Sequence, residues 1–122
     1  MNDIPFQHGD TFIDCGASIG ELHFWFRLNE ININYIGFEP SPAEFSCLKR
    51  NLPTQTVLNR GLWNENGNMS FFVSSDGGDS SFIEPYKYTD TISIKCERLE
   101  NYVKGRVRCL KLEAEGAEPE VL

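Results

Sequence analysis

The sequence predicts an α/β fold with a mostly parallel sheet, and three stretches in its first half carry that prediction. Residues 11–15 are β-compatible and include an acid, Asp14. A turn of small residues follows, and residues 19–29 then show the apolar spacing of an amphipathic helix. Residues 33–39 form a second β-type run that ends in another acid. Strand, turn, helix and strand make a β-α-β unit, whose ligands bind beyond the carboxyl ends of the strands.

The turn after the first strand is the most informative stretch for function. It carries Gly16, Ala17 and Ser18, and Gly20 opens the helix. Glycine at position 16 lets the backbone turn sharply and lets a ligand approach the main chain. The N–H groups at the start of the helix should face that ligand, and Asp14 should stand beside it at the carboxyl end of its strand.

Four interpretations of this turn are open on the residues alone. A dinucleotide prefers G-x-G-x-x-G, whose middle glycine is absent here. Residues 16–20 match the G-x-S-x-G of a nucleophile elbow, but that site needs a histidine after its serine, and no histidine follows His23. An S-adenosylmethionine site typically carries a signature that resembles D-x-G-A-x-x-G, as residues 14–20 do. The fourth interpretation is an ordinary β–α turn without a ligand.

The composition bounds the classes of function. The 122 residues suffice for one domain, and a net charge of −7 counts against an electrostatic nucleic-acid binder. No apolar run approaches the roughly 18 residues of a membrane span, and the start has no secretory signal, so a cytoplasmic protein is expected. The four cysteines form no C-x-x-C pair, so no metal is expected, and they should be small core residues in a reducing compartment.

The acid at the end of the second strand, Glu39, is the candidate for binding a ribose. It follows Gly20 by 19 residues and ends the next strand of the unit, where a carboxylate can accept both ribose hydroxyls. The alternative is a solvated surface acid. A helix should then start at Ser41, because Ser41 and Glu44 match a capping box with proline at the first helical position, and Pro53 should end it.

The first helix, 19–29, is apolar over more than half of its circumference. Such a helix is usually covered on more than one side. Its histidine, His23, lies one turn after Gly20 and is expected to be partly buried rather than to face a ligand.

The second half of the chain predicts a hairpin and two further strands. Residues 55–63 form a strand, Asn66-Gly67 a turn, and residues 69–74 the returning strand. Residues 75–90 show no periodicity and are either a flexible cover over a site or plain disorder. The remaining elements are expected as strands at 91–96 and 107–113, with one or two helical turns at 98–104 between them.

The last expected strand ends in an acid, Glu113, and two more acids, Glu115 and Glu118, follow it. At a surface these carboxylates would simply be solvated, whereas beside a sulfonium or a metal they would be stabilising. No histidine joins the group, so the pattern gives a metal little support.

Four blocks in a fixed order cover nearly the whole chain: 14–20; 37–42 with Leu48 and Asn51; 59–63 with Gly67 and Phe71-Phe72; and 110–118 with 120–122. Together they resemble the FkbM family of S-adenosylmethionine-dependent methyltransferases. The resemblance implies one Rossmann-like methyltransferase domain over residues 1–122, with a mostly parallel sheet and an inserted β-hairpin.

The resemblance also implies roles for individual residues. The methionine side of S-adenosylmethionine would be lined by Asp14, Gly16, Ala17, Ser18 and Gly20. Glu39, followed by Pro40, would hold the ribose, and the adenine would lie near Gly61, Leu62 and Trp63. Glu113 and Glu115 would stand near the transferred methyl as a base or as substrate-orienting acids, although the family more often has aspartate in place of Glu113.

The reaction so implied is methyl transfer to a hydroxyl on a sugar or small natural product, with neither nucleic acid nor membrane as partner. Alignment of the reactants can supply ~7–11 kcal/mol of the barrier. Three alternatives remain: a cofactor-binding module without turnover, a nicotinamide-dependent oxidoreductase, and an interaction domain that binds no cofactor. The oxidoreductase fits Gly16, Gly20 and Glu39 but lacks the glycine triplet and leaves the block at 110–118 unexplained.

The chain stops at Leu122, about one turn into the helix expected after Gly116. The expectation is a domain that lacks its C-terminal strands and leaves one sheet edge open. A homodimer that buries this edge is then a reasonable arrangement.

Overall fold

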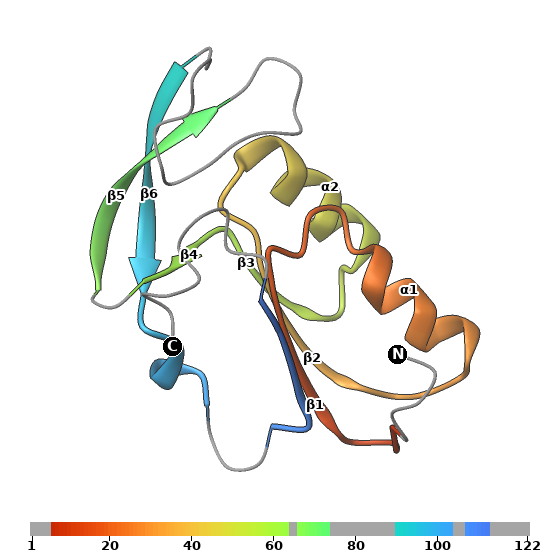
Figure 1. The fold of residues 1–122 in the computed structure, drawn as a ribbon. Helices are drawn as coiled ribbons and strands as arrows, with labels where there is room; N and C mark the ends of the chain where they lie inside the picture. Colours follow the sequence, from red (N-terminus) through yellow and green to blue (C-terminus); the bar gives the residue numbers. More distant parts are fainter. Residues whose placement is uncertain (1–5, 64–65, 74–89, 104–106, 113–122) are drawn as a thin grey trace.

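The computed structural model describes residues 6–63, 66–73, 90–103 and 107–112 of the chain. Over these residues the chain forms two α-helices, two β-sheets and one short 3₁₀ helix (Figure 1). In chain order the elements are β1 (Thr11–Cys15), α1 (Glu21–Leu28), β2 (Asn34–Phe38), α2 (Pro42–Asn51), β3 (Thr56–Leu58), β4 (Gly61–Leu62), β5 (Gly67–Val73), β6 (Asp90–Glu97), η1 (Leu99–Asn101) and β7 (Cys109–Leu112).

A four-stranded parallel sheet is the centre of the fold. Its order is β3-β2-β1-β7, and each neighbouring pair is parallel. The register places Asp14 of β1 opposite Gly37 of β2 on one side and opposite Lys111 of β7 on the other. The predicted α/β class and the β-α-β unit are therefore confirmed, and the carboxyl ends of β1 and β2 lie side by side.

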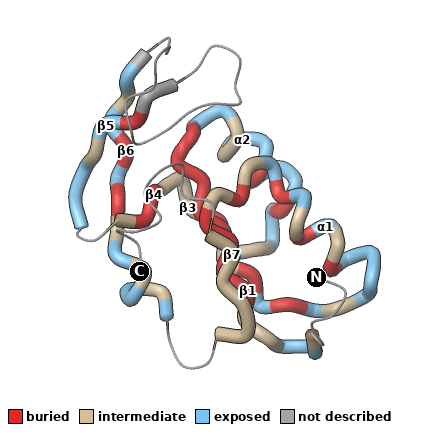
Figure 2. The backbone as a smooth tube through the Cα atoms, viewed as in Figure 1, coloured by how far each residue is buried: buried red, intermediate tan, exposed pale blue. Residues whose placement is uncertain are grey.

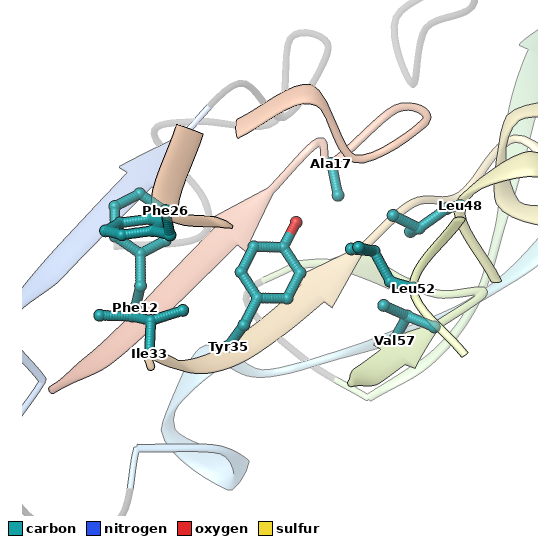
Figure 3. Close-up of a cluster of buried hydrophobic side chains, with 8 residues drawn as sticks. All are labelled: Phe12, Ala17, Phe26, Ile33, Tyr35, Leu48, Leu52 and Val57. Atoms are coloured by element: carbon teal, nitrogen blue, oxygen red, sulfur yellow. The ribbon is translucent and has the colours of Figure 1, made fainter. Parts of the chain in front are cut away.

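Hydrophobic cores lie on both faces of this sheet, because successive residues of a strand point to opposite faces. On the face covered by α1 and α2, Phe12 and Tyr35 pack with Phe26 and Leu48 (Figure 3). On the other face, Ile13 packs with residues of β4, β5 and β6. Figure 2 shows the buried positions concentrated along β1 and the strands beside it. Both faces of the central strand are thus covered.

The predicted single strand over 55–63 is wrong, because the structure divides it into β3 and β4, which belong to different sheets. The chain leaves the parallel sheet at Asn59. Its side-chain amide donates hydrogen bonds to the carbonyl oxygens of Glu39, at 2.9 Å, and Pro40, at 3.0 Å. These two bonds hold the chain against the end of β2, so the strand cannot continue straight past it.

The predicted hairpin partner is wrong as well. β5 pairs antiparallel with β6, from Gly67 opposite Cys96 to Val73 opposite Asp90, and β4 pairs in parallel with β6. The inserted antiparallel pair is present, but its two strands lie on either side of residues 74–89 in the sequence. The strand predicted at 91–96 is confirmed, with alternate residues buried. The expected helical turns are the 3₁₀ helix η1, and the last expected strand is β7.

The start of α2 is confirmed at Pro42, but the predicted capping box does not form. In a capping box the Glu44 carboxylate would accept the N–H of Ser41. Here Glu39 accepts that N–H at 2.9 Å instead, and the hydroxyl of Ser41 donates to the Glu44 carboxylate. Glu39, the buried acid at the end of β2, therefore replaces Glu44 as the acceptor of the Ser41 N–H.

One apolar side of α1 is buried within the described residues. Phe26 is fully buried, whereas Phe24 and Leu28 are 55% and 68% exposed, so the described part of the chain does not cover this helix on two sides. No helix among the described residues is long and apolar enough to cross a membrane.

All four cysteines lie among the described residues, and none of them is in a disulfide. The expectation of core cysteines is confirmed for Cys15 and Cys96, which are buried, while Cys109 is half-buried. It is wrong for Cys47, which is exposed on α2.

Candidate cofactor site

The turn between β1 and α1 depends on two glycines. Gly16 has a φ of 83° and Gly20, the N-cap of α1, a φ of 97°, and both lie in the left-handed region that favours glycine. A Cβ atom at Gly20 would also lie 3.1 Å from the Leu52 side chain and 3.2 Å from the Leu48 side chain. Gly20 therefore provides both a turn conformation and close packing of the turn on α2.

The N–H groups of this turn are bonded to the end of β2. Gly16 and Ala17 both donate to the carbonyl oxygen of Phe38, each at 2.9 Å. Ser18, which has a φ of 54°, donates its N–H to Oε1 of Glu39 at 2.8 Å. A ligand above the turn would thus meet a backbone already held in place, not three unused donors.

Glu39 is an acid bonded directly to the turn, and it is buried, at 8% exposure. Its two carboxylate oxygens accept the N–H groups of Ser18 and Ser41, one on each oxygen. Burial raises the pKa of Glu39, and these two hydrogen bonds oppose the rise. An ionised carboxylate offers about four acceptor positions, so the two contacts leave acceptor capacity for ligand hydroxyls.

The segment Gly61–Trp63 follows Asn59, which is bonded to the end of β2. The Asn59 amide bonds the carbonyls of Glu39 and Pro40, and β4 follows two residues later. Leu62 is 1% exposed and packs in the core opposite the helices, while the N–H of Trp63 donates to the Glu97 carbonyl at 3.0 Å.

Asp14 is buried at the end of β1, next to the turn. Its side chain is 0% exposed. The Tyr35 hydroxyl donates to Oδ2 at 2.6 Å, and the Lys111 ammonium lies 3.0 Å from Oδ1. The same ammonium donates to the carbonyl oxygen of Gly16 at 2.9 Å. Asp14 is thus part of the support of the turn.

Tyr35 and Lys111 were not among the residues predicted from the sequence. One sequence signal for Tyr35 exists, at Gly37. A Cβ atom at Gly37 would lie 2.8 Å from the Tyr35 ring, so glycine is what allows the ring to lie along β2 and reach Asp14. Figure 3 shows the Tyr35 hydroxyl pointing toward the turn that carries Ala17. Lys111 can be identified only once the strand order is known, because it lies 97 residues from Asp14 in the sequence and meets it through the pairing of β1 with β7.

The structure places the predicted cofactor residues of the turn and of the end of β2 at neighbouring strand ends. The turn and Glu39 are in direct contact, and Pro40 and Gly61–Trp63 are linked to them through Asn59. The two predicted catalytic acids, Glu113 and Glu115, lie outside the described residues. The stretch 75–90, predicted as a cover or a disordered loop, lies outside them as well except for its last residue.

A groove of about 740 Å³ lies elsewhere, between the C-terminal ends of α1 and α2, and is lined in part by His23, Arg27 and Arg50. His23 is buried, more fully than the sequence predicted, and burial together with Arg27 lowers its pKa. Its ring packs edge-on against Tyr35 at 5.1 Å. This groove is lined by neither the turn residues 16–18 nor Glu39.

The fold and this arrangement define an α/β domain with a glycine turn and a buried acid at neighbouring strand ends. The chain belongs to the FkbM methyltransferase domain family, whose model matches residues 14–122.

Two known proteins are similar to this chain over nearly its whole length. It is 24% identical over 147 residues to Methyltransferase 1 of Beauveria bassiana (strain ARSEF 2860), covering 97% of this chain and 59% of that protein. The crystal structure of methyltransferase FkbM from Methylobacillus flagellatus KT superimposes with a TM-score of 0.68 at 19% identity. That match covers 97% of this chain and 29% of the other, so the chain spans only part of either relative.

Proposed function

We propose that this chain binds S-adenosylmethionine at the turn between β1 and α1 and takes part in methyl transfer to a hydroxyl group. The observation that carries the proposal is the contact between the glycine turn and a buried acid on the next strand, the Ser18 N–H to Glu39 bond of 2.8 Å. Membership of the FkbM methyltransferase domain family supports the same reaction class.

The chemistry of the described residues fits this cofactor. In the proposed complex Gly16, Ala17 and Ser18 contact the methionine part, and Glu39 accepts hydrogen bonds from the ribose hydroxyls. Gly61–Trp63 would flank the adenine. S-adenosylmethionine supplies an electrophilic methyl group on a sulfonium. The protein would contribute mainly by holding two reactants in line, which lowers the barrier without further covalent chemistry.

The proposed base or substrate-orienting acid is Glu113 or Glu115. A general base typically contributes ~10²–10⁴-fold to a rate. Methyl-transfer rates of Glu113→Gln and Glu115→Gln would test this role, and rates within a few-fold of the unmodified chain would remove it. The acceptor proposed is a sugar or small natural product, and the assembly proposed is a homodimer in the cytoplasm.

The test of the cofactor is calorimetric titration with S-adenosylmethionine and, separately, with a nicotinamide dinucleotide. We expect binding of the first at micromolar Kd and no binding of the second. The Glu39→Ala variant should no longer bind S-adenosylmethionine. Glu100→Ala is the matched control, because Glu100 is also a glutamate but lies on the surface with its side chain 66% exposed.

The outcomes separate the candidate functions. Binding with turnover supports the methyltransferase, and binding without turnover supports a cofactor module. Binding of the nicotinamide dinucleotide alone would overturn the proposal. Equal binding by the Glu39→Ala and Glu100→Ala variants would remove Glu39 from the site.

A further inference from the structure

Lys111 joins the last described strand to the glycine turn. It stands on β7 directly opposite Asp14 of β1. Its ammonium group lies 3.0 Å from Oδ1 of Asp14 and donates to the Gly16 carbonyl oxygen at 2.9 Å. The side chain is 28% exposed, whereas that of Asp14 is fully buried. Among the described residues, this cation therefore contacts one acceptor on the strand and one in the turn.

The turn is held from two directions. From β2, the Phe38 carbonyl accepts the N–H groups of Gly16 and Ala17. From β7, Lys111 holds the carbonyl oxygen of the same Gly16. A peptide with a positive φ has little steric preference of its own when the residue is glycine, so these outside contacts decide its orientation.

We propose that Lys111 is a positioning residue for the cofactor turn, which fixes the Gly16 carbonyl and thereby the conformation that binds the cofactor. This inference rests on the proposed function for its effect on affinity, but its structural part does not. Lys111 acts through the turn, and Asp14 acts as the anchor that holds the ammonium group between β1 and the turn.

Tyr35 completes the anchor from the other side. Its hydroxyl donates to Oδ2 of Asp14 at 2.6 Å, so each carboxylate oxygen has its own donor. Burial and the neighbouring Asp14 raise the pKa of the Tyr35 phenol, which therefore remains a neutral donor. Because both oxygens of the buried Asp14 carboxylate accept hydrogen bonds, the carboxylate has a defined position and holds the Lys111 ammonium group next to the turn.

The competing explanation is that Lys111 only neutralises a buried charge. Removing one partner of such a pair leaves the other charge uncompensated and destabilises the whole fold. The two roles separate in a double variant. Asp14→Asn with Lys111→Met removes both charges of the described pair, so stability should recover relative to Lys111→Met alone, but the Gly16 carbonyl still lacks the Lys111 donor.

The experiment measures amide hydrogen exchange at Gly16, Ala17 and Ser18, together with the thermal midpoint and the Kd for S-adenosylmethionine. In the double variant we expect exchange at these three amides to accelerate by about tenfold or more, as for the loss of one charge-assisted hydrogen bond. The Kd should weaken by about tenfold. Lys95→Met is the control, because Lys95 is a 61% exposed lysine on β6. Its amide exchange rates in the turn and its Kd should match those of the unmodified chain.

Each result decides one question. If the double variant regains stability and keeps both the exchange protection and the Kd of the unmodified chain, Lys111 is only a charge partner and the inference fails. If Lys111→Met alone does not fold, the double variant carries the test. If the unmodified chain binds no S-adenosylmethionine, the proposed function fails, while the exchange measurement still decides the role of Lys111.

Discussion

Glu39 accepts the backbone N–H of Ser18 at 2.8 Å, so the acid that ends β2 is bonded directly to the turn that follows β1. The two residues are 21 positions apart in the sequence, and all of α1 lies between them. This contact joins the two strand ends that form the candidate site. It also explains why the capping box of α2 fails, since the same carboxylate takes the N–H of Ser41.

The first prediction concerns pH. Burial raises the pKa of Glu39 above its ordinary value of 4.5. A carboxyl group with a higher pKa in the folded chain binds more protons when folded. The stabilisation that Glu39 gains in this way is fully present below its pKa in the unfolded chain. It is lost as the pH rises through its pKa in the folded chain. The free energy of unfolding should therefore fall as the pH rises in a window that starts near 4.5.

Urea denaturation at a series of pH values, on the unmodified chain and on Glu39→Gln, measures this effect. The difference between the two proteins should change across the window, because glutamine does not titrate. The affinity for S-adenosylmethionine should change in the opposite direction and rise with pH, since the ionised carboxylate is the better acceptor for hydroxyls. Parallel stability profiles for the two proteins would contradict the assignment.

The second prediction compares two glycines. Gly20→Ala should destabilise the fold by about 1–3 kcal/mol for its positive φ, and further for the contact of the new Cβ with Leu48 and Leu52. Gly9→Ala is the matched control, because Gly9 has a φ of 85° but a Cβ atom there would meet nothing within 4 Å. Chemical denaturation should show a larger loss at Gly20, and equal losses would mean that packing on α2 adds nothing.

Much of the fold could be predicted from the sequence, because local signals and the tertiary structure agree there. The acid-glycine turn, the apolar spacing of 19–29 and the proline at position 42 placed β1, α1, β2 and α2 within a few residues. The prediction failed at 55–63, where the run of β-compatible residues continues but the chain changes sheets. The cause is the pair of hydrogen bonds from Asn59 to the end of β2. This long-range contact is not indicated by any periodic pattern in the sequence.

The candidate site, like the fold, was predicted only in part. Gly16, Gly20 and Glu39 were identified from their spacing, and the structure brings them together. The support beneath them was not, since Lys111 reaches Asp14 only through the strand order β1-β7, which no local pattern encodes. Asp14 itself was expected beside the ligand, and its full burial became visible only with Tyr35 and Lys111 in place.

The third prediction tests the buried tyrosine. Tyr35→Phe removes the hydrogen bond to Asp14 and leaves a buried carboxylate oxygen without that donor, which should cost about 1.5–3 kcal/mol. Tyr102→Phe is the control, because its hydroxyl also bonds a carboxylate, that of Glu97, in a partly exposed position. Denaturant unfolding should give a clearly smaller loss for Tyr102→Phe, and the reverse order would show that Tyr35 contributes only its ring.

The last prediction concerns Asn59, which links the acid to β4. Asn59→Ala removes both amide bonds to the carbonyls of Glu39 and Pro40, so the chain after β3 should lose its fixed position relative to the acid. We expect a stability loss of about 1–3 kcal/mol and a weaker affinity for S-adenosylmethionine.

Asn29→Ala is the control for this variant, because its amide also donates to a backbone carbonyl, that of Trp25, but in an exposed position. Its effect on both quantities should be small, since water replaces the lost partner. Calorimetric titration then decides what Asn59 does. A variant that is less stable but binds with unchanged Kd would show that Asn59 only supports the fold. A weakened Kd in Asn59→Ala beside an unchanged one in Asn29→Ala would show that the adenine side of the site depends on where the chain turns away from β2.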